Sequence, residues 1–359
     1  MKICIIIPSI RRFEYWAKYS NDFKKYGHEP DIYVIDEEYG EARDNNKVLM
    51  GNQVEFFGRK ERQQWFKDRD LEDSVIPPKA HAEISFGLLV AYEMGDYDMV
   101  VFVDDDTYPK DSDFLGKNWM ALNSTTNITS DLRKWVNVTG GVYYPRGYPY
   151  GERVNPTNLN YESPKTSGTV VLNQGLWTGV PDMNAVDILA RGGLDGRCTI
   201  DLKVEGSNII GFGSYVTVCS MNLSFRPEII PAFYQLYMNR EMMHGIDRFD
   251  DIWSGVFLKK ILDHVGTSMS YGVPLCVHDK QPRDIFRDVK AEMEGLIINE
   301  TLWKVVDEIE LTESGYLNSY FELASKLSEQ RHRFHLPDYI EFMCRKMMRW
   351  TRLIEKIES

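Results

Sequence analysis

The sequence predicts an α/β protein with a doubly wound, mostly parallel sheet and a helical C-terminal extension. Two observations lead to this class. Short, continuously apolar runs alternate with segments of helical periodicity between Ile3 and Val103, which is typical of parallel strands joined by crossover helices. Polar side chains then gather where those apolar runs end, as expected of a site at the carboxyl edge of a parallel sheet.

The elements of the first half follow from where the apolar runs begin and stop. Predicted strands cover residues 3–7, 31–35, 54–57 and 100–103. Each is a short apolar run without helical spacing. Predicted helices cover residues 11–26 and 79–94. Each is followed by a glycine, Gly27 or Gly95, the residue that most readily adopts the left-handed conformation after a helix.

Three consecutive aspartates, Asp104, Asp105 and Asp106, follow the strand 100–103. Side chains alternate along an extended chain, so Asp104 and Asp106 can face one way while Asp105 faces the other. Three carboxylates at the tip of an apolar strand are costly unless a cation neutralises them. Mn²⁺ and Mg²⁺ prefer such oxygen ligands and also bind phosphate oxygens. We therefore predict a metal–diphosphate site here, with a solvated acidic turn as the alternative.

Other polar residues are expected at the same edge of the sheet. Ser9, Arg11 and Asp36 fall at the ends of the first two strands, which is the edge where ligands bind in such sheets. His278 follows a predicted strand at 273–277. A neutral imidazole there could complete the shell of the cation, and a purely structural histidine is the alternative.

The middle of the chain is predicted to consist of long loops with short strands. Residues 140–213 are rich in Gly, Pro, Asn and Tyr, and they include Trp177. Aromatic rings near a metal–phosphate site suit the apolar face of a sugar or base, although aromatic packing under a loop would give the same pattern. Residues 214–225 look β-like, and Pro227 is expected to begin a helix that covers residues 228–237.

A further helix is predicted to begin at Arg248-Phe249-Asp250-Asp251-Ile252-Trp253 and to stop at Gly266. Asp250 and Asp251 fall in its first turn, where they either complement the helix dipole or present a carboxylate pair to a sugar or acceptor. We expect the second role, because Arg248 and Trp253 accompany them.

The chain is expected to be mostly helical from about residue 300 onward. Apolar residues recur there at spacings of three and four, while basic residues lie largely off that stripe: Ile340, Met343, Met347, Trp350, Ile354 and Ile357, against Arg345, Arg349, Arg352 and Lys356. This pattern predicts a helix docked on the body of the protein or on a second subunit. The alternative is peripheral contact of the basic face with an anionic membrane or product.

Composition narrows the class of protein. The 359 residues carry 42 Lys+Arg and 54 Asp+Glu, a formal net charge of −12, which argues against nucleic acid as a partner. The five cysteines are scattered and suggest neither a zinc site nor a disulfide framework. No signal peptide or stretch of transmembrane length is recognised, so we expect a cytoplasmic protein.

Several segments, taken in order, resemble one family, the reversibly glycosylated polypeptides or UDP-arabinopyranose mutases of glycosyltransferase family 75. The resemblance spans roughly residues 3–290. The matching pieces are Ile7-Pro8-Ser9-Ile10-Arg11, Pro78-Lys79-Ala80 with Ile84-Ser85-Phe86, Asp104-Asp105-Asp106, Arg146-Gly147-Tyr148-Pro149 with Arg153, Gly175-Leu176-Trp177 with Pro181-Asp182, Met221-Asn222-Leu223, Arg248-Phe249-Asp250-Asp251-Ile252-Trp253, and His278 followed by Lys280.

This resemblance implies a GT-A fold, a divalent cation that is usually Mn²⁺, and a UDP-sugar donor. It also implies reversible self-glycosylation at an arginine, which Arg146 matches, and a second essential arginine, which Arg153 matches. On these grounds we expect the donor or sugar to be bound by Pro8, Ser9, Arg11, Asp36, Lys79, Asp105, Trp177, Asn222, Arg248, Trp253 and Lys280. The chain departs from the plant pattern at Gln174, where those proteins carry histidine.

The predicted mechanism assigns the cation to Asp104, Asp106 and His278 and the sugar acceptor to Arg146. Because a guanidinium is a poor nucleophile, Asp250 or Asp251 is expected to act as its base. Two alternatives are a conventional glycosyltransferase that passes the sugar to an external carbohydrate acceptor and a non-catalytic subunit that binds a nucleotide sugar. An aspartyl phosphatase is disfavoured, because Thr107 comes one residue too early for the motif of that class.

The predicted domain organisation places a catalytic domain at residues 1–295 and a helical extension at residues 296–359. Within the first, residues 1–110 form the nucleotide-binding half and residues 140–280 the sugar and acceptor half.

Overall fold

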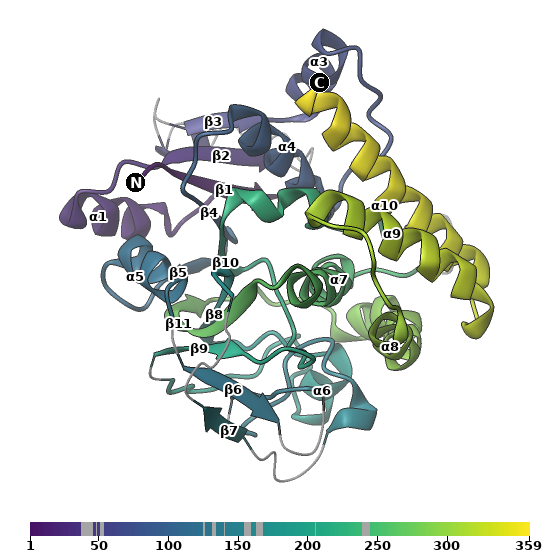
Figure 1. Cartoon of the computed structure of the whole chain (residues 1–359). Coiled ribbons are helices and arrows are strands. Elements are labelled where there is room, and N and C mark those ends of the chain that lie inside the picture. Colours follow the sequence, from purple (N-terminus) through teal and green to yellow (C-terminus); the bar gives the residue numbers. More distant parts are fainter. Residues whose placement is uncertain are drawn as a thin grey trace.

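The structure is a computed structural model of the whole chain. It describes residues 1–36, 46–47, 49–50, 54–124, 126–130, 134–139, 141–153, 159–162, 168–204, 206–238 and 245–359. Figure 1 shows a single sheet that runs through the molecule, with helices packed on both of its faces.

The first half of the sheet is parallel, as predicted. Strand β1 (Ile3–Ser9) lies between β2 (Asp31–Asp36) and β4 (Met99–Val103), and β3 (Val54–Phe57) pairs with β2 on the outside. The order β3-β2-β1-β4 is visible at the top of Figure 1. The carboxyl ends of β1, β2 and β4 therefore lie at one edge of the sheet, which is where the site was expected.

Beyond β4 the sheet is mixed. Strand β10 (Asn222–Phe225) is antiparallel to both β4 and β8 (Val170–Gly179), and β11 (Ser268–His278) runs parallel to β8. The sheet continues through the strands β9 (Ser207–Ile210), β6 (Asn127–Ser130) and β7 (Leu159–Glu162), while β5 (Thr107–Pro109) pairs with the end of β11. The α/β class is confirmed, and its parallel character is strongest in the first half.

The helical elements of the described residues follow here in chain order. They are α1 (Trp16–Tyr26), α3 (Arg59–Asp68), η2 (His81–Glu83), α4 (Ile84–Met94), α5 (Phe114–Ala121), η3 (Tyr150–Glu152), α6 (Ala185–Ala190), η4 (Pro227–Ala232), α7 (Asp250–Val265), α8 (Ile285–Glu308), α9 (Tyr316–Glu329), η5 (Gln330–Arg333) and α10 (Pro337–Glu358).

Strand β1 divides its side chains between two hydrophobic clusters, one on each face of the sheet. Ile5 packs in a cluster with Tyr19 and Phe23 of α1, whereas Ile6 packs in a second cluster with Phe86 of α4. This alternation has the period of two that a strand imposes. Because both faces are covered, the strand is apolar throughout, which explains why it reads as a continuous hydrophobic run.

Several predicted boundaries differ from the structure for local reasons. Helix α1 begins at Trp16 rather than at residue 11, because the hydroxyl of Ser9 and the amide of Asn46 donate to the carbonyl of Arg11 and hold a turn there. The predicted helix at 228–237 is only the short 3₁₀ segment η4. It contains Pro231, which has no N–H to continue a helix.

Several elements were not recognised in the sequence, among them α3, α5, β5 and β6. Helix α3 contains mostly polar residues, so it lacks the apolar stripe that marks a surface helix. Strand β8 was predicted as loop with short strands, because residues 140–213 are rich in Gly, Pro, Asn and Tyr. In the structure this strand includes Asn173 and Gln174. Both side chains are fully buried and donate to backbone carbonyls, Asn173 to Val273 and Gln174 to Asn222.

The helical extension lies against the body of the protein. The apolar stripe of α10 is buried from Ile340 to Ile354 in the same cluster that contains Ile6, so docking on the body is confirmed. The predicted boundary at residues 295 and 296 falls inside α8, and the division into domains stays a prediction. None of the described helices is both long enough and apolar enough to traverse a lipid bilayer.

Candidate active site

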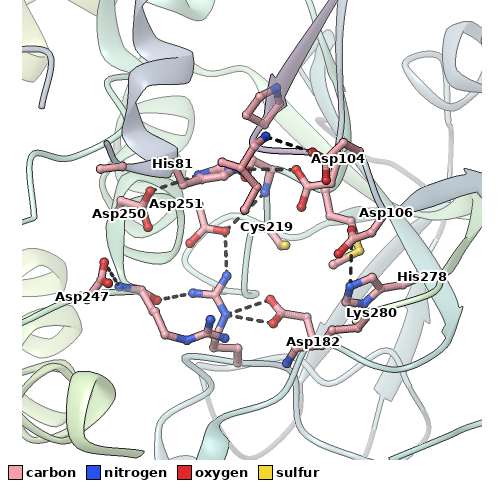
Figure 2. Close-up of a pocket in the computed structure, with 18 of the residues that line it drawn as sticks. His81, Asp104, Asp106, Asp182, Cys219, Asp247, Asp250, Asp251, His278 and Lys280 are labelled. Carbon is pink, nitrogen blue, oxygen red and sulfur yellow. Dashed lines mark hydrogen bonds and ion pairs between the residues drawn. The ribbon is translucent and has the colours of Figure 1, made fainter. Parts of the chain in front are cut away.

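A pocket of about 290 Å³ opens at the carboxyl edge of the sheet. Segments far apart in the sequence supply its walls. They are the ends of β1, β4 and β11, the turn before η2, the loops at Arg146 and Asp182, the residues before β10, and the first turn of α7. Figure 2 shows that acidic and basic side chains point into it from all sides.

Most of the predicted site residues line this pocket. They are Pro8, Arg11, Lys79, Asp104, Asp105, Asp106, Arg146, Arg248, Asp250, Asp251, His278 and Lys280. The sheet explains this convergence. Strands β10 and β8 lie between β4 and β11, but all four belong to one sheet, and the ends of β4 and β11 both reach the pocket.

The corner formed by Asp104, Asp106 and His278 has the chemistry of a metal site. His278 Nε2 lies 3.6 Å from Asp106 Oδ1, and these labelled side chains face each other in Figure 2. His278 Nδ1 donates to the carbonyl of Val180 at 2.7 Å, which leaves Nε2 as the nitrogen that faces Asp106. Histidine ligands are commonly oriented in this way by a carbonyl on their other nitrogen.

A second observation also supports a divalent cation at these residues. Asp104 Oδ1 is buried and accepts no hydrogen bond, which is costly for a carboxylate oxygen unless something else neutralises it. Among the described residues, no three His, Cys, Asp or Glu side chains lie close enough to form a ready-made cage. Mg²⁺ and Mn²⁺ need no such cage, because phosphate oxygens and water usually complete their shells.

Asp105 faces away from this corner, as the alternation of side chains predicted. Its oxygens contact Arg11 Nε at 3.0 Å and the N–H of Ile10 at 3.1 Å. Burial raises the pKa of Asp105 to about 7, although Arg11 opposes the shift. Asp105 therefore joins the end of β4 to the turn after β1 and holds Arg11 at the mouth of the pocket.

Arg146 lies at the opposite side of the pocket, and acceptors surround its guanidinium. Its Nε donates to both oxygens of Asp182 at 2.9 Å, and Nη2 donates to Asp251 Oδ2 at 2.8 Å. Nη1 donates to the backbone carbonyl of Arg248. Asp182 and Asp251 are labelled in Figure 2, where their contacts are drawn as dashed lines.

Burial alone would lower the pKa of Arg146, but Asp182 and Asp251 outweigh it and raise this pKa above its ordinary value. The pKa of Asp182 is lowered, because Arg146 outweighs the effect of burial. The pKa of Asp251 is raised, mainly by burial and also by the charge of Asp250. Of the two carboxylates, Asp251 is therefore the one more prone to take up a proton.

His81 is a pocket residue that sequence reasoning missed. Its Nδ1 donates to Asp250 Oδ2 at 3.1 Å, and its Nε2 lies 3.1 Å from the hydroxyl of Ser220 and 3.6 Å from Asp104 Oδ1. Asp250 and Asp251 thus have different partners, although they are adjacent in sequence. The signal for His81 was its position directly after Pro78-Lys79-Ala80, one of the segments that carried the family resemblance.

Asp182 was noted only as part of Pro181-Asp182, although it makes the bidentate contact with Arg146. No spacing in the sequence connects Asp182 with Arg146, so the pair could not be predicted. The other lining residues that were not predicted are Ile10, Ala80, Cys219, Ser220, Met221, Asp247 and Arg283.

Lys280 is a buried cation whose ammonium forms no ion pair with a carboxylate within the described part of the chain. Its side chain lies in the pocket with 6 % of its surface exposed. Burial, together with the neighbouring Arg283 and Arg248, lowers the pKa of Lys280 to about 8. A buried ammonium of this kind favours an anion as its partner.

The remaining predicted residues lie outside the lining of the pocket. Arg153 forms a bidentate ion pair with Asp187 and packs over the ring of Tyr150. Trp253 donates to Asn299 in the core, and Asn222 donates to the carbonyls of Leu176 and Pro274. Trp177, Ser9 and Asp36 are also buried near the strands rather than at the pocket wall. Direct contact of these six with a substrate stays a prediction.

The comparisons with known proteins agree with the resemblance seen in the sequence. Residues 2–359 match the family model described as reversibly glycosylated polypeptide. UDP-arabinopyranose mutase 3 of Arabidopsis thaliana is 24% identical over 367 residues, which cover 99% of this chain and 91% of that protein. UDP-arabinopyranose mutase 1 of Oryza sativa subsp. japonica is 26% identical over 306 residues, covering 83% and 75%.

Among solved structures, the chain is similar to glucosyl-3-phosphoglycerate synthase from Mycobacterium tuberculosis in complex with phosphoglyceric acid. That alignment has a TM-score of 0.44 and 11% identity, and it covers 84% of this chain and 80% of the other. The match of the family model to nearly every residue is the decisive finding. The chain belongs to the reversibly glycosylated polypeptide family.

Proposed function

We propose that this protein is an enzyme that acts on a UDP-sugar with the help of a divalent cation, Mn²⁺ or Mg²⁺, in the manner of a UDP-arabinopyranose mutase. Membership of the family and the names of the mutases that match nearly the whole chain support the reaction class. The observation that carries the proposal is that Arg146, held between Asp182 and Asp251, lines the same pocket as Asp104, Asp106 and His278.

Two groups of the pocket are complementary to a metal-bound diphosphate. Asp104 Oδ1 accepts no hydrogen bond, and the ammonium of Lys280 is buried beside Arg283 and Arg248. Asp104, Asp106 and His278 would hold the cation, which supplies Lewis-acid neutralisation of the charge on the departing UDP. Lys280 would donate to a phosphate oxygen, and Arg11 would face the nucleotide at the mouth of the pocket.

Arg146 is proposed as the transient acceptor of the sugar. A nitrogen of its guanidinium would bond to the anomeric carbon as the bond from that carbon to the UDP oxygen breaks, and one N–H proton would pass to a base. Asp251 Oδ2, which lies 2.8 Å from Nη2, has the geometry for that base. Asp250 contacts His81 instead, so its proposed role is to fix the position of the His81 ring in the pocket.

A conventional glycosyltransferase is the second candidate, and one observation favours it. Asp182 and Asp251 raise the pKa of Arg146, which stabilises a cation and opposes nucleophilic attack. In that case Arg146 would neutralise leaving-group charge and an external hydroxyl would take the sugar.

The experiment that separates the two uses radiolabelled UDP-sugars with Mn²⁺. Under the proposal, label is retained on the native protein, is located at Arg146 by peptide mass spectrometry, and is lost in Arg146→Lys, which preserves the charge. Label that passes to an added carbohydrate without appearing on the protein would favour the conventional transferase. Absence of any donor cleavage by the native protein would contradict both and leave only a binding subunit.

A further inference from the structure

Glu292 on α8 is a fully buried carboxylate that lies outside the pocket lining and uses both of its oxygens. Oε1 accepts from Arg248 Nε at 2.6 Å, and Oε2 accepts from the backbone N–H of Ala185 at 2.6 Å. A buried carboxylate is retained only when such contacts satisfy it. These two partners belong to different segments, and each segment holds one side of Arg146.

The first segment runs through Arg248, which adopts a left-handed backbone conformation with φ 67°. This conformation is uncommon for a residue with a side chain, and it persists only where the surroundings enforce it. Here it accompanies the hydrogen bond from Arg146 Nη1 to the carbonyl of Arg248. The ion pair with Glu292 anchors the other end of Arg248, because its Nε is held against the buried carboxylate.

The second segment runs from Asp182 to Ala185. Asp182 accepts from Arg146 twice, through its carboxylate and through its backbone carbonyl, which receives the N–H of Arg146 at 2.9 Å. Asn184 accepts from the N–H of Gly147 at 2.9 Å. The bond from Ala185 to Glu292 fixes the end of this segment at the start of α6.

We propose that Glu292 is a positioning residue that sets the orientation of the Arg146 guanidinium relative to Asp251. It ties the Arg248 segment and the 182–185 segment to one rigid helix, so the acceptors on either side of Arg146 cannot move independently. This inference rests on the proposed function, in which the distance between Arg146 and Asp251 decides the rate of sugar transfer. Among the described residues, Glu292 forms no hydrogen bond or ion pair with Asp104, Asp106, His278 or Lys280. Binding of UDP is therefore expected to be independent of Glu292.

The test replaces Glu292 by glutamine, which has nearly the same shape but only one acceptor oxygen. Its NH₂ group would face either Arg248 Nε or the N–H of Ala185, and one of the two ties would be lost. We expect the single-turnover rate of Arg146 labelling at saturating UDP-sugar to fall about a hundredfold. The UDP concentration that gives half-saturation should stay within about twofold, because the groups proposed to hold the diphosphate, Asp104, Asp106, His278 and Lys280, are not partners of Glu292.

Two further variants make the result specific. Glu294→Gln is the matched control, since Glu294 lies on the same helix and pairs with His335 at the surface, and its labelling rate should equal that of the native protein. Ala185→Pro removes only the N–H that Glu292 accepts, at the first position of α6, where proline is tolerated. It should slow labelling in the same way as Glu292→Gln, and it tests the inference if that variant does not fold.

A purely structural role would lower the melting temperature and leave the rate per folded molecule unchanged, and that result would overturn the inference. Equal rates in the native protein and Glu292→Gln would do the same. Should the native protein consume UDP-sugar without any label at Arg146, the covalent route of the proposed function fails. The positioning role of Glu292 is then tested by the rate of UDP-sugar consumption. That rate must still fall in Glu292→Gln while the affinity for UDP is retained.

Discussion

At the scale of single residues, adjacent positions in the sequence have separate tasks in the pocket. Asp250 and Asp251 are consecutive, yet one contacts His81 and the other contacts Arg146. The first turn of a helix produces this divergence, because neighbouring side chains there point about 100° apart. Sequence reasoning identified the pair as acidic residues of a site, but it could not assign a partner to either one.

Lys280 provides a test of the diphosphate site that depends on pH. Because its pKa is lowered to about 8, the ammonium is charged below that pH and becomes neutral above it. A bound phosphate stabilises the charged form, so affinity for UDP with Mg²⁺ should fall as the pH rises above about 8, by up to about tenfold for each pH unit. Titration calorimetry at a series of pH values measures this slope.

The matched variant for that prediction is Lys280→Arg, whose guanidinium stays charged throughout the range. Its affinity for UDP should be nearly flat between about pH 7 and about 9. Identical pH profiles for the native protein and the variant would mean that another group controls binding and that Lys280 does not contact the diphosphate.

Arg153 illustrates a residue whose place could not be anticipated from spacing. It follows Arg146 by seven positions, but its guanidinium is committed to Asp187 on α6 and to the ring of Tyr150. The intervening 3₁₀ segment η3 turns the chain away from the pocket. These contacts join Arg153 to α6 and to η3, and its role in the reaction stays a prediction.

At the scale of elements, strand β10 decides how the two halves of the pocket meet. It lies antiparallel between β4 and β8, so its start, rather than its end, is next to the aspartates. Cys219 and Ser220 reach the pocket for that reason. The run 214–225 looked like one strand, and nothing in its residues indicated the direction or the neighbours of β10.

Helix α10 offers a stability test of the docked extension. Met347 lies on its buried stripe and is fully inaccessible to solvent, so Met347→Ala should lower the free energy of unfolding by about 2–5 kcal/mol. Chemical denaturation followed by circular dichroism measures the change. A loss below about 0.5 kcal/mol would contradict tight docking of the helix on the body.

Arg345 serves as the control on the exposed face of the same helix. It pairs with Glu341 one turn earlier, and 68% of its side-chain surface is exposed. Exposed pairs of this kind contribute little to stability, so Arg345→Ala should change the free energy of unfolding by less than about 0.5 kcal/mol. The comparison separates loss of packing from loss of charge on one element.

At the scale of the whole molecule, the two ends of the chain share one hydrophobic cluster. Ile6 of β1 and Ile354 of α10 belong to it, and Tyr234 stacks on Trp350 with ring centroids 5.1 Å apart. In Figure 1, α10 runs along the right side of the molecule and packs beside α9. The catalytic half therefore has part of its core supplied by the extension.

Removal of that extension should prevent independent folding. A chain that ends at residue 295 is cut within α8 and also loses α9 and α10. Each large apolar side chain that it exposes costs about 1.5–3 kcal/mol, and several of them exceed the total stability of about 5–15 kcal/mol that is usual for a domain. Calorimetry of residues 1–295 should show no cooperative melting transition.

A truncated chain that melts cooperatively and still binds UDP with Mn²⁺ would contradict this expectation. It would instead support the predicted division into a catalytic domain at 1–295 and a separate extension. A chain that ends at residue 357 is the control, because it lacks only the end of α10 and should melt near the temperature of the native protein.

The sequence alone determined the parallel strands of the first half, the aspartates at the end of β4, and the motifs that place the chain in its family. These features are local, because the spacing of apolar residues, the ends of strands and the motifs are all set by residues that are close together in the sequence. The structure alone decided which charges meet. Asp182, His81 and Glu292 are separated from Arg146 by 36, 65 and 146 positions. Only the folded sheet and helix α8 bring such residues together, because pairing across that distance depends on packing and leaves no periodic signal in the chain.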